Sequence, residues 1–119
     1  METIKNDHVF FVDCDDTLVL WDTKDFPEDQ WTWIDHAGYK TMLVPHTKNI
    51  EVLKKFARLG YHITVWSATG YEWADAIVKH LGLTEYVHQV MSKPRYYMDD
   101  LPCQEWMGER VYYDPLAKE

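Results

Sequence analysis

The chain has 119 residues, of which 46% are hydrophobic and 15% aromatic, so it is long enough for one folded domain and too short for two. Its 20 acidic and 12 basic residues give a net charge of −8, which works against attraction to nucleic acid or to an anionic membrane. Two cysteines, no long apolar run and no signal-like N-terminus predict a cytoplasmic protein with neither a disulfide framework nor a membrane span.

The first predicted element is a buried strand that ends in acidic residues. The apolar run Val9 to Val12 is rich in β-branched and aromatic types, and Asp13 and Asp15 follow it. In open α/β sheets, ligands bind beyond the carboxyl ends of the strands. We therefore expect both carboxylates to face a crevice.

Residues 21–45 lack a helical period and predict a β-hairpin insert. Two β-prone segments, 31–34 and 39–44, flank a turn that contains Gly38. Two alternatives stay open for this insert. It is either a flap over the acidic residues or an ordinary surface hairpin whose tryptophans pack on the domain.

The middle of the chain alternates between helix and strand. An amphipathic helix is expected from residues 45–47 to Gly60, and a second buried strand over 61–66 runs into Ser67. A second helix is expected over 71–81. The alternation predicts a mainly parallel sheet with right-handed crossovers.

Local signals complete the expected elements. Thr69 and Glu72 have the spacing of a capping box at the start of the second helix. Residues 102–108 could hold one turn of helix. Short strands are expected near the C-terminus over 87–91, 96–98 and 111–113.

Polar side chains follow the predicted strands in a fixed order: Asp13, Asp15, Ser67, Lys93, Asp99 and Asp100. This order resembles the four motifs of the haloacid dehalogenase superfamily of phosphotransferases. The matching stretches are 13–17, 63–67, Lys93 and 96–100. The resemblance implies a single-domain, three-layer α/β sandwich with a Rossmann-like, mainly parallel sheet over residues 1–119. The insert at about 21–45 is too short to be a cap domain.

The resemblance implies a Mg²⁺-dependent phosphatase that hydrolyses a phosphomonoester through an aspartyl-phosphate. Phosphoryl transfer needs a nucleophile, a proton donor and cations against the phosphoryl oxygens. Asp13 would be the nucleophile and Asp15 the general acid and base. Ser67, backbone amides after Asp13, and Lys93 would bind the phosphate.

The metal site implied by the resemblance uses hard oxygen ligands. Mg²⁺ would be held by the carboxylates of Asp13 and Asp99 and by the backbone carbonyl of Asp15, with Asp100 in support. One spacing departs from the family pattern, because only five residues separate Lys93 from Asp99 whereas a parallel crossover needs about a dozen. Either the third or the fourth strand is vestigial, or Lys93 does not bind the phosphate.

Several functional alternatives stay open. A small phosphorylated metabolite, such as a nucleotide or a sugar phosphate, is the expected substrate, and the negative net charge disfavours a polynucleotide end. The insert's aromatic side chains could stack a base or a sugar, and a homo-oligomer could complete the site. From other classes, a phosphorylated switch or a non-catalytic binding protein remain alternatives. The histidines His36, His62 and His88 show no ligand spacing and are interpreted as structural or surface residues.

Overall fold

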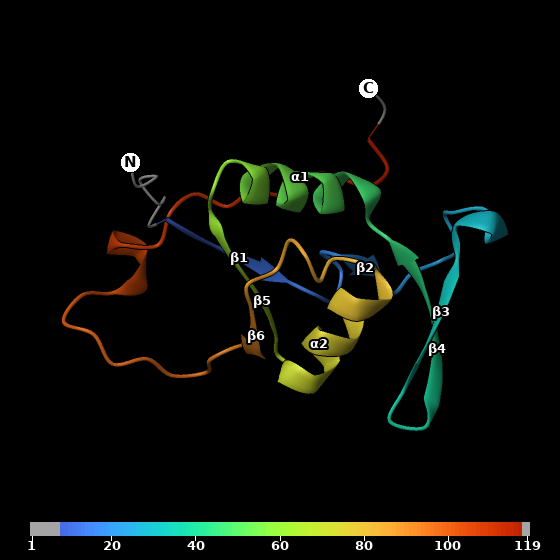
Figure 1. Ribbon diagram of the computed structural model, residues 1–119, viewed down its shortest axis with the longest axis horizontal. Helices are drawn as coiled ribbons and strands as arrows, with labels where there is room; N and C mark the ends of the chain where they lie inside the picture. The colour runs from blue at the N-terminus through green and yellow to red at the C-terminus, as the bar shows by residue number, and fades with distance from the viewer. Residues whose placement is uncertain (1–7, 118–119) are drawn as a thin grey trace.

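The computed structural model describes residues 8–117 as an α/β fold with two helices and two small sheets (Figure 1). No helix in this part of the chain is long and apolar enough to cross a membrane. The strands are β1 (Val9–Asp13), β2 (Val19–Leu20), β3 (Thr32–His36), β4 (Tyr39–Pro45), β5 (His62–Ser67) and β6 (Gln89–Ser92). The helices are α1 (Thr47–Arg58) and α2 (Tyr71–His80), with short 3-10 turns at Glu28–Gln30 and Cys103–Glu105.

A parallel three-stranded sheet carries the acidic residues. Its order is β1-β5-β6, with Asp13 opposite Trp66 and Ser67 opposite Ser92. The carboxyl ends of the three strands therefore meet at one end of the sheet. The predicted α/β class and parallel pairing are confirmed, and β1 lies at an edge of this sheet because no strand of residues 8–117 pairs with its other side.

The core lies on one face of the parallel sheet. Side chains alternate along a strand, so Val12 and Val65 face the core together with Leu53 of α1 and Ile77 of α2. The amphipathic patterns predicted both helices with nearly the observed bounds. The opposite face carries Phe11, which stacks on Trp66.

The expected hairpin is confirmed as β3 and β4. The two strands pair antiparallel, with Thr32 opposite Leu43 at one end and His36 opposite Tyr39 at the other. Its turn has positive φ at Ala37 and at Gly38, the geometry of a tight two-residue turn. Strand β4 also pairs with β2, so the hairpin is joined to the chain that follows β1. Ile34 and Leu43 are buried in the core, which fixes the inner face of the hairpin.

The capping box predicted for α2 is wrong. The N-cap is Gly70, whose φ of 128° suits a residue without Cβ, and no side chain caps the helix. The first helical amide, at Tyr71, instead donates to the hydroxyl of Ser92 at 3.0 Å. Strand β6 thus satisfies the helix end that Thr69 was expected to cap.

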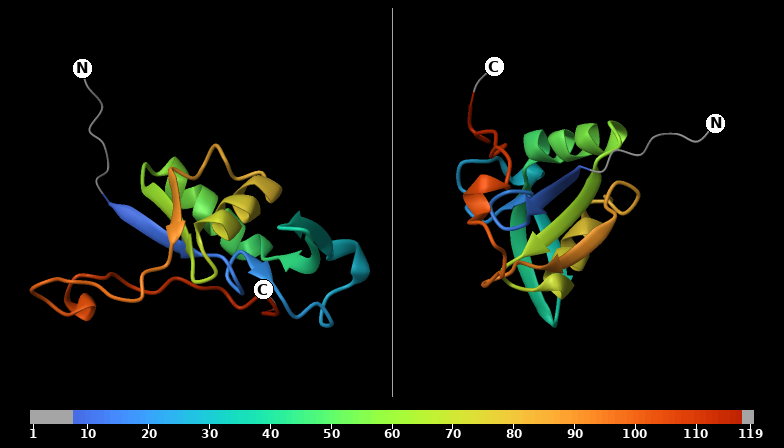
Figure 2. Two further views of the ribbon diagram at one scale, coloured as in Figure 1. Left: turned by 90° about the horizontal axis from the view of Figure 1, so that it is seen from below. Right: turned by 90° about the vertical axis from the view of Figure 1, so that its left-hand side faces the viewer.

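The strands expected at 96–98 and 111–113 are also wrong. After Ser92 the chain runs away from the sheet as an irregular orange segment and returns past α1 in red (Figures 1 and 2). Tyr96 and Met98 are almost fully exposed. A β-prone sequence this short forms a strand only where a partner strand accepts its hydrogen bonds. The third predicted strand is therefore present as β6, and the fourth is vestigial.

Candidate functional site

A tight loop after β1 presents the first acidic pair. The carbonyl of Cys14 accepts hydrogen bonds from the amides of Thr17, Leu18 and Val19, and the amide of Asp16 donates to Val19. Asp16 has a positive φ of 60°, which asparagine and aspartate tolerate better than most residues. These four amides are engaged inside the loop. The predicted role of backbone amides after Asp13 as phosphate ligands stays a prediction.

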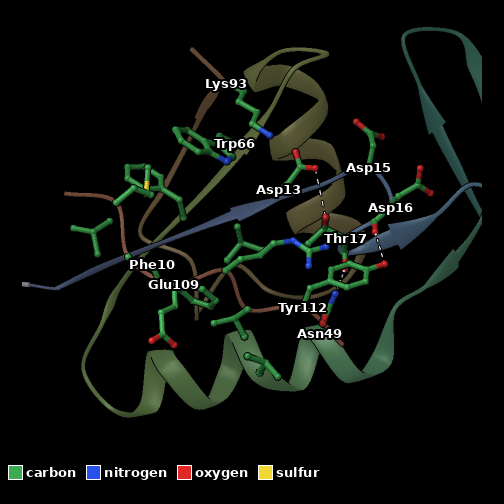
Figure 3. Close-up of a pocket in the computed structure, with 18 residues that line it drawn as sticks. Phe10, Asp13, Asp15, Asp16, Thr17, Asn49, Trp66, Lys93, Glu109 and Tyr112 are labelled. Atoms are coloured by element: carbon green, nitrogen blue, oxygen red, sulfur yellow. Dashed lines mark hydrogen bonds between the residues drawn. The ribbon is translucent and has the colours of Figure 1, made fainter. Parts of the chain in front are cut away.

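Asp13 ends β1 and lines a cavity of about 690 Å³. Among residues 8–117, its carboxylate accepts one hydrogen bond, from the hydroxyl of Thr17 at 3.4 Å. The rest of this carboxylate stays open to a ligand. Figure 3 shows the side chains of Asp13 and Lys93 pointing toward one another across the cavity.

Lys93 is brought to the same cavity by β6. Its amide donates to the carbonyl of Ser67 at 2.8 Å, which extends the β5 to β6 pairing by one residue. Its Nζ lies 5.9 Å from the ring centroid of Trp66, within the range of a cation–π contact. The structure therefore brings together Asp13 and Lys93, as the sequence predicted.

Asp15 is the most densely hydrogen-bonded carboxylate of the site. Its Oδ1 accepts from the indole nitrogens of Trp21 and Trp73, each at 2.9 Å. Its Oδ2 lies 3.4 Å from the hydroxyls of Ser67 and Thr69. These donors come from the insert, from α2 and from the end of β5, so three separate parts of the chain fix one side chain.

Ser67 contacts Asp15 and does not line the cavity. Its side chain is fully buried, its Oγ donates to Asp15, and the same atom accepts from the amide of Thr69 at 3.0 Å. In this geometry Ser67 orients Asp15. Its predicted role as a phosphate ligand stays a prediction.

Asp99 does not line the cavity shared by Asp13, Asp15 and Lys93. It is exposed, accepts from the amide of Leu101 at 3.0 Å in its own turn, and is not among the residues that line the cavity. Within residues 8–117, no group of three or more histidine, cysteine, aspartate or glutamate side chains is arranged to hold a metal ion. The adjacent Asp100 is also exposed.

The remaining oxygens still suit Mg²⁺. Magnesium in proteins often has only one or two carboxylate ligands and completes its shell with waters and substrate phosphate. The Asp13 carboxylate is largely free, and the backbone of Asp15 follows two residues later. These two residues would hold the ion, with Asp16 lining the same cavity.

The second wall of the cavity was missed by the sequence analysis. Residues 107–112 line it opposite β1, together with Asn49 and Val52 of α1. The sequence predicts only a strand at 111–113, so no signal in it assigns this segment to a site. The exposed hairpin aromatics Trp33 and Tyr39 do not line this cavity, and Trp31 donates to carbonyls of Thr23 and Phe26 within the insert.

Cys14 is a buried thiol with no direct role at the cavity. Burial, with added repulsion from the charges of Asp15 and then Asp13, raises its pKa from an ordinary 9.0 to about 12. The thiol is therefore protonated at neutral pH and is a poor nucleophile. Although Cys14 stands between two acidic residues in the sequence, its side chain packs in the hydrophobic core.

Comparison of the chain with protein-family models, with curated proteins and with solved structures gives no match.

Proposed function

We propose that the protein is a Mg²⁺-dependent phosphatase, a compact, capless relative of the haloacid dehalogenase superfamily. One observation carries the proposal: Asp13, at the carboxyl end of β1, shares a cavity with Lys93, and Asp15 is held beside them by four donors. In this proposal a small phosphorylated metabolite is the substrate, and the protein acts in the cytoplasm.

In the first step, an open carboxylate oxygen of Asp13 attacks phosphorus in line with the leaving oxygen. The new bond is between that oxygen and phosphorus, and the bond from phosphorus to the leaving oxygen breaks. Asp15 gives a proton to the leaving oxygen. Lys93 lies on the cavity wall where its ammonium group can offset the charge on the phosphoryl oxygens.

The hydrogen bonds of Asp15 indicate which oxygen carries the proton. Oδ1 already accepts two indole N–H groups at 2.9 Å, whereas Oδ2 has only two hydroxyl neighbours at 3.4 Å. A hydroxyl can rotate to accept instead of donate, whereas an indole N–H cannot. We therefore assign the transferred proton to Oδ2.

In the second step, water attacks the phosphorus of the aspartyl-phosphate. Asp15 takes a proton from that water, the bond between Asp13 and phosphorus breaks, and inorganic phosphate leaves. The enzyme returns to its starting protonation state. Bound Mg²⁺ would supply positive charge against the phosphoryl oxygens.

The proposal is tested with Asp13→Asn, Asp15→Asn and Asp29→Asn, assayed on p-nitrophenyl phosphate with Mg²⁺. Asp29 is an exposed residue of the insert outside the cavity, so Asp29→Asn controls for the loss of one carboxylate. We expect Asp13→Asn to lower kcat at least a thousandfold and Asp29→Asn to match the wild type. Full activity of Asp13→Asn rejects the proposal.

A second readout separates the enzyme from a phosphorylated switch. Incubation of the wild type with ³²P-labelled acetyl phosphate should leave no stable label, because the aspartyl-phosphate hydrolyses, whereas Asp15→Asn should accumulate it. Stable label on the wild type without turnover would favour the switch. Mg²⁺ binding without label or turnover would favour a binding protein.

A further inference from the structure

The second wall of the cavity carries a cation that the proposed mechanism does not use. We call residues 107–113 the strap. Its residues 107–112 line the cavity opposite β1, and they include Arg110. The guanidinium carbon of Arg110 lies 5.0 Å from the ring centroid of Tyr112, so the arginine packs on a residue of its own segment.

The strap is attached to the catalytic loop and to α1 by three hydrogen bonds. The hydroxyl of Tyr112 donates to the carbonyl of Asp16 at 3.1 Å. The amide of Tyr113 donates to Oδ1 of Asn49 at 3.1 Å, and its carbonyl lies 2.8 Å from Nε2 of His46. The ring beneath Arg110 is thus held on the same loop that presents Asp13.

Both cations of the cavity lack a carboxylate partner. Within residues 8–117, the ion pairs are confined to Lys24, Lys54 and Lys79, so neither Lys93 nor Arg110 is paired. The chain has eight more acidic than basic residues, and three aspartates line this same cavity. Each cation is instead packed on an aromatic ring, which leaves its N–H donors available to an anion.

The two cations of the cavity are packed on different aromatic rings. Figure 3 shows Lys93 and Tyr112 on opposite sides of Thr17, with the Asp13 carboxylate on the Lys93 side. Lys93 packs on the ring of Trp66, whereas Arg110 packs on the ring of Tyr112. A cavity of about 690 Å³ is also large enough for a whole metabolite.

We infer that Arg110 binds a second anionic group of the substrate, on the part that leaves after phosphoryl transfer. The substrate class is then a phosphomonoester whose organic part bears a carboxylate or another phosphate. This inference rests on the proposed function, because it takes the bound molecule to be a substrate of the phosphatase. Arginine suits the role because its planar donors match a carboxylate or phosphate in a bidentate geometry.

The kinetic test compares two substrates that differ by one anionic group, 3-phosphoglycerate and glycerol 1-phosphate. The variants are Arg110→Ala, Arg110→Lys and the control Arg95→Ala. Arg95 is exposed and lies outside the cavity, and its replacement removes the same charge.

We expect Arg110→Ala to lower the preference for 3-phosphoglycerate, measured as the ratio of kcat/KM values, at least tenfold, mainly through KM. Arg110→Lys should restore part of it, and Arg95→Ala should match the wild type. An unchanged preference in Arg110→Ala overturns the inference.

A binding test is independent of turnover. In the Asp13→Asn background, calorimetry compares inorganic pyrophosphate, with two linked phosphates, with inorganic phosphate. We expect pyrophosphate to bind at least tenfold more tightly and added Arg110→Ala to abolish that difference. Equal binding of the two anions with Arg110 present overturns the inference. If the wild type hydrolyses no phosphomonoester while the pyrophosphate preference depends on Arg110, the proposed catalysis fails and the anion site stands.

Discussion

The indole nitrogen of Trp73 lies 2.9 Å from Oδ1 of Asp15, although 58 residues separate them in the chain. Trp21 donates to the same oxygen at the same distance, and the centroids of the two rings are 6.2 Å apart. Helix α2 and the start of the insert therefore meet at one carboxylate oxygen. The orientation of Asp15 depends on tertiary packing as much as on the loop that carries it.

Replacing Trp73 with phenylalanine should lower activity. Phenylalanine fills most of the space that the indole occupies, but it cannot donate to the carboxylate of Asp15. A hydrogen bond to a charged group is worth about 1.5–3 kcal/mol. We expect kcat on p-nitrophenyl phosphate to fall at least tenfold. Trp21→Phe should act in the same direction. The exposed Trp33 provides the control, and Trp33→Phe should retain the wild-type kcat. Equal kcat in all three variants would mean that the indole donors do not orient Asp15.

The buried thiol of Cys14 predicts a loss of stability at alkaline pH. Its folded pKa is about 12, whereas the unfolded thiol ionises near 9, so between these values the unfolded state binds fewer protons than the folded state. Stability then falls as pH rises, at up to about 1.4 kcal/mol per pH unit. Below pH 9 this contribution to the free energy of unfolding is fully present.

The measurement is urea unfolding of the wild type, Cys14→Ala and Cys103→Ala at pH 8 and pH 10. We expect the wild type and Cys103→Ala to lose about 1.4 kcal/mol more than Cys14→Ala over this interval. Equal losses in all three proteins would show that the thiol ionises equally in both states.

His46 joins the start of α1 to the strap, and its two ring nitrogens have separate roles. Nδ1 accepts from the amide of Asn49 at 3.2 Å, so the proton is on Nε2, which donates to the carbonyl of Tyr113. The ring is almost fully buried. His46→Ala removes both bonds and should destabilise the fold by about 2–4 kcal/mol, since a lost cap alone costs about 1 kcal/mol.

His46→Asn separates the two roles. Asparagine can accept from the amide of Asn49 as an N-cap but is too short to keep the contact with Tyr113. We expect His46→Asn to recover at least half of the stability lost in His46→Ala, measured by urea unfolding. Hydrogen exchange at the amide of Tyr113 should be faster than in the wild type. Unchanged exchange at this amide would show that His46 does not hold the strap.

Magnesium affinity distinguishes the two acidic motifs. Asp13 is open to the cavity, whereas Asp99 is exposed and accepts a hydrogen bond within its own turn. We expect Asp13→Asn to weaken Mg²⁺ binding at least tenfold by calorimetry, and Asp99→Asn and Asp29→Asn to change it less than twofold. A loss in Asp99→Asn as large as in Asp13→Asn would place Asp99 in the metal shell.

The sequence alone determined the elements whose signal is local. The apolar run before Asp13 and the periodic faces expected from 45–47 to Gly60 and over 71–81 predicted β1, α1 and α2, because burial of one face is encoded by residue spacing. The tight-turn residues around Gly38 likewise predicted the hairpin. The order of these elements placed Asp13 and Lys93 at the same end of a parallel sheet.

Tertiary structure decided the features that depend on distant partners. Segment 96–98 has strand propensity but finds no partner strand, and Thr69, spaced as a cap, contacts Asp15 instead. No local pattern predicts that Trp73 reaches Asp15 or that the strap covers one side of the cavity. Such contacts form only where the packed core brings remote segments within hydrogen-bonding distance, so residue spacing does not encode them.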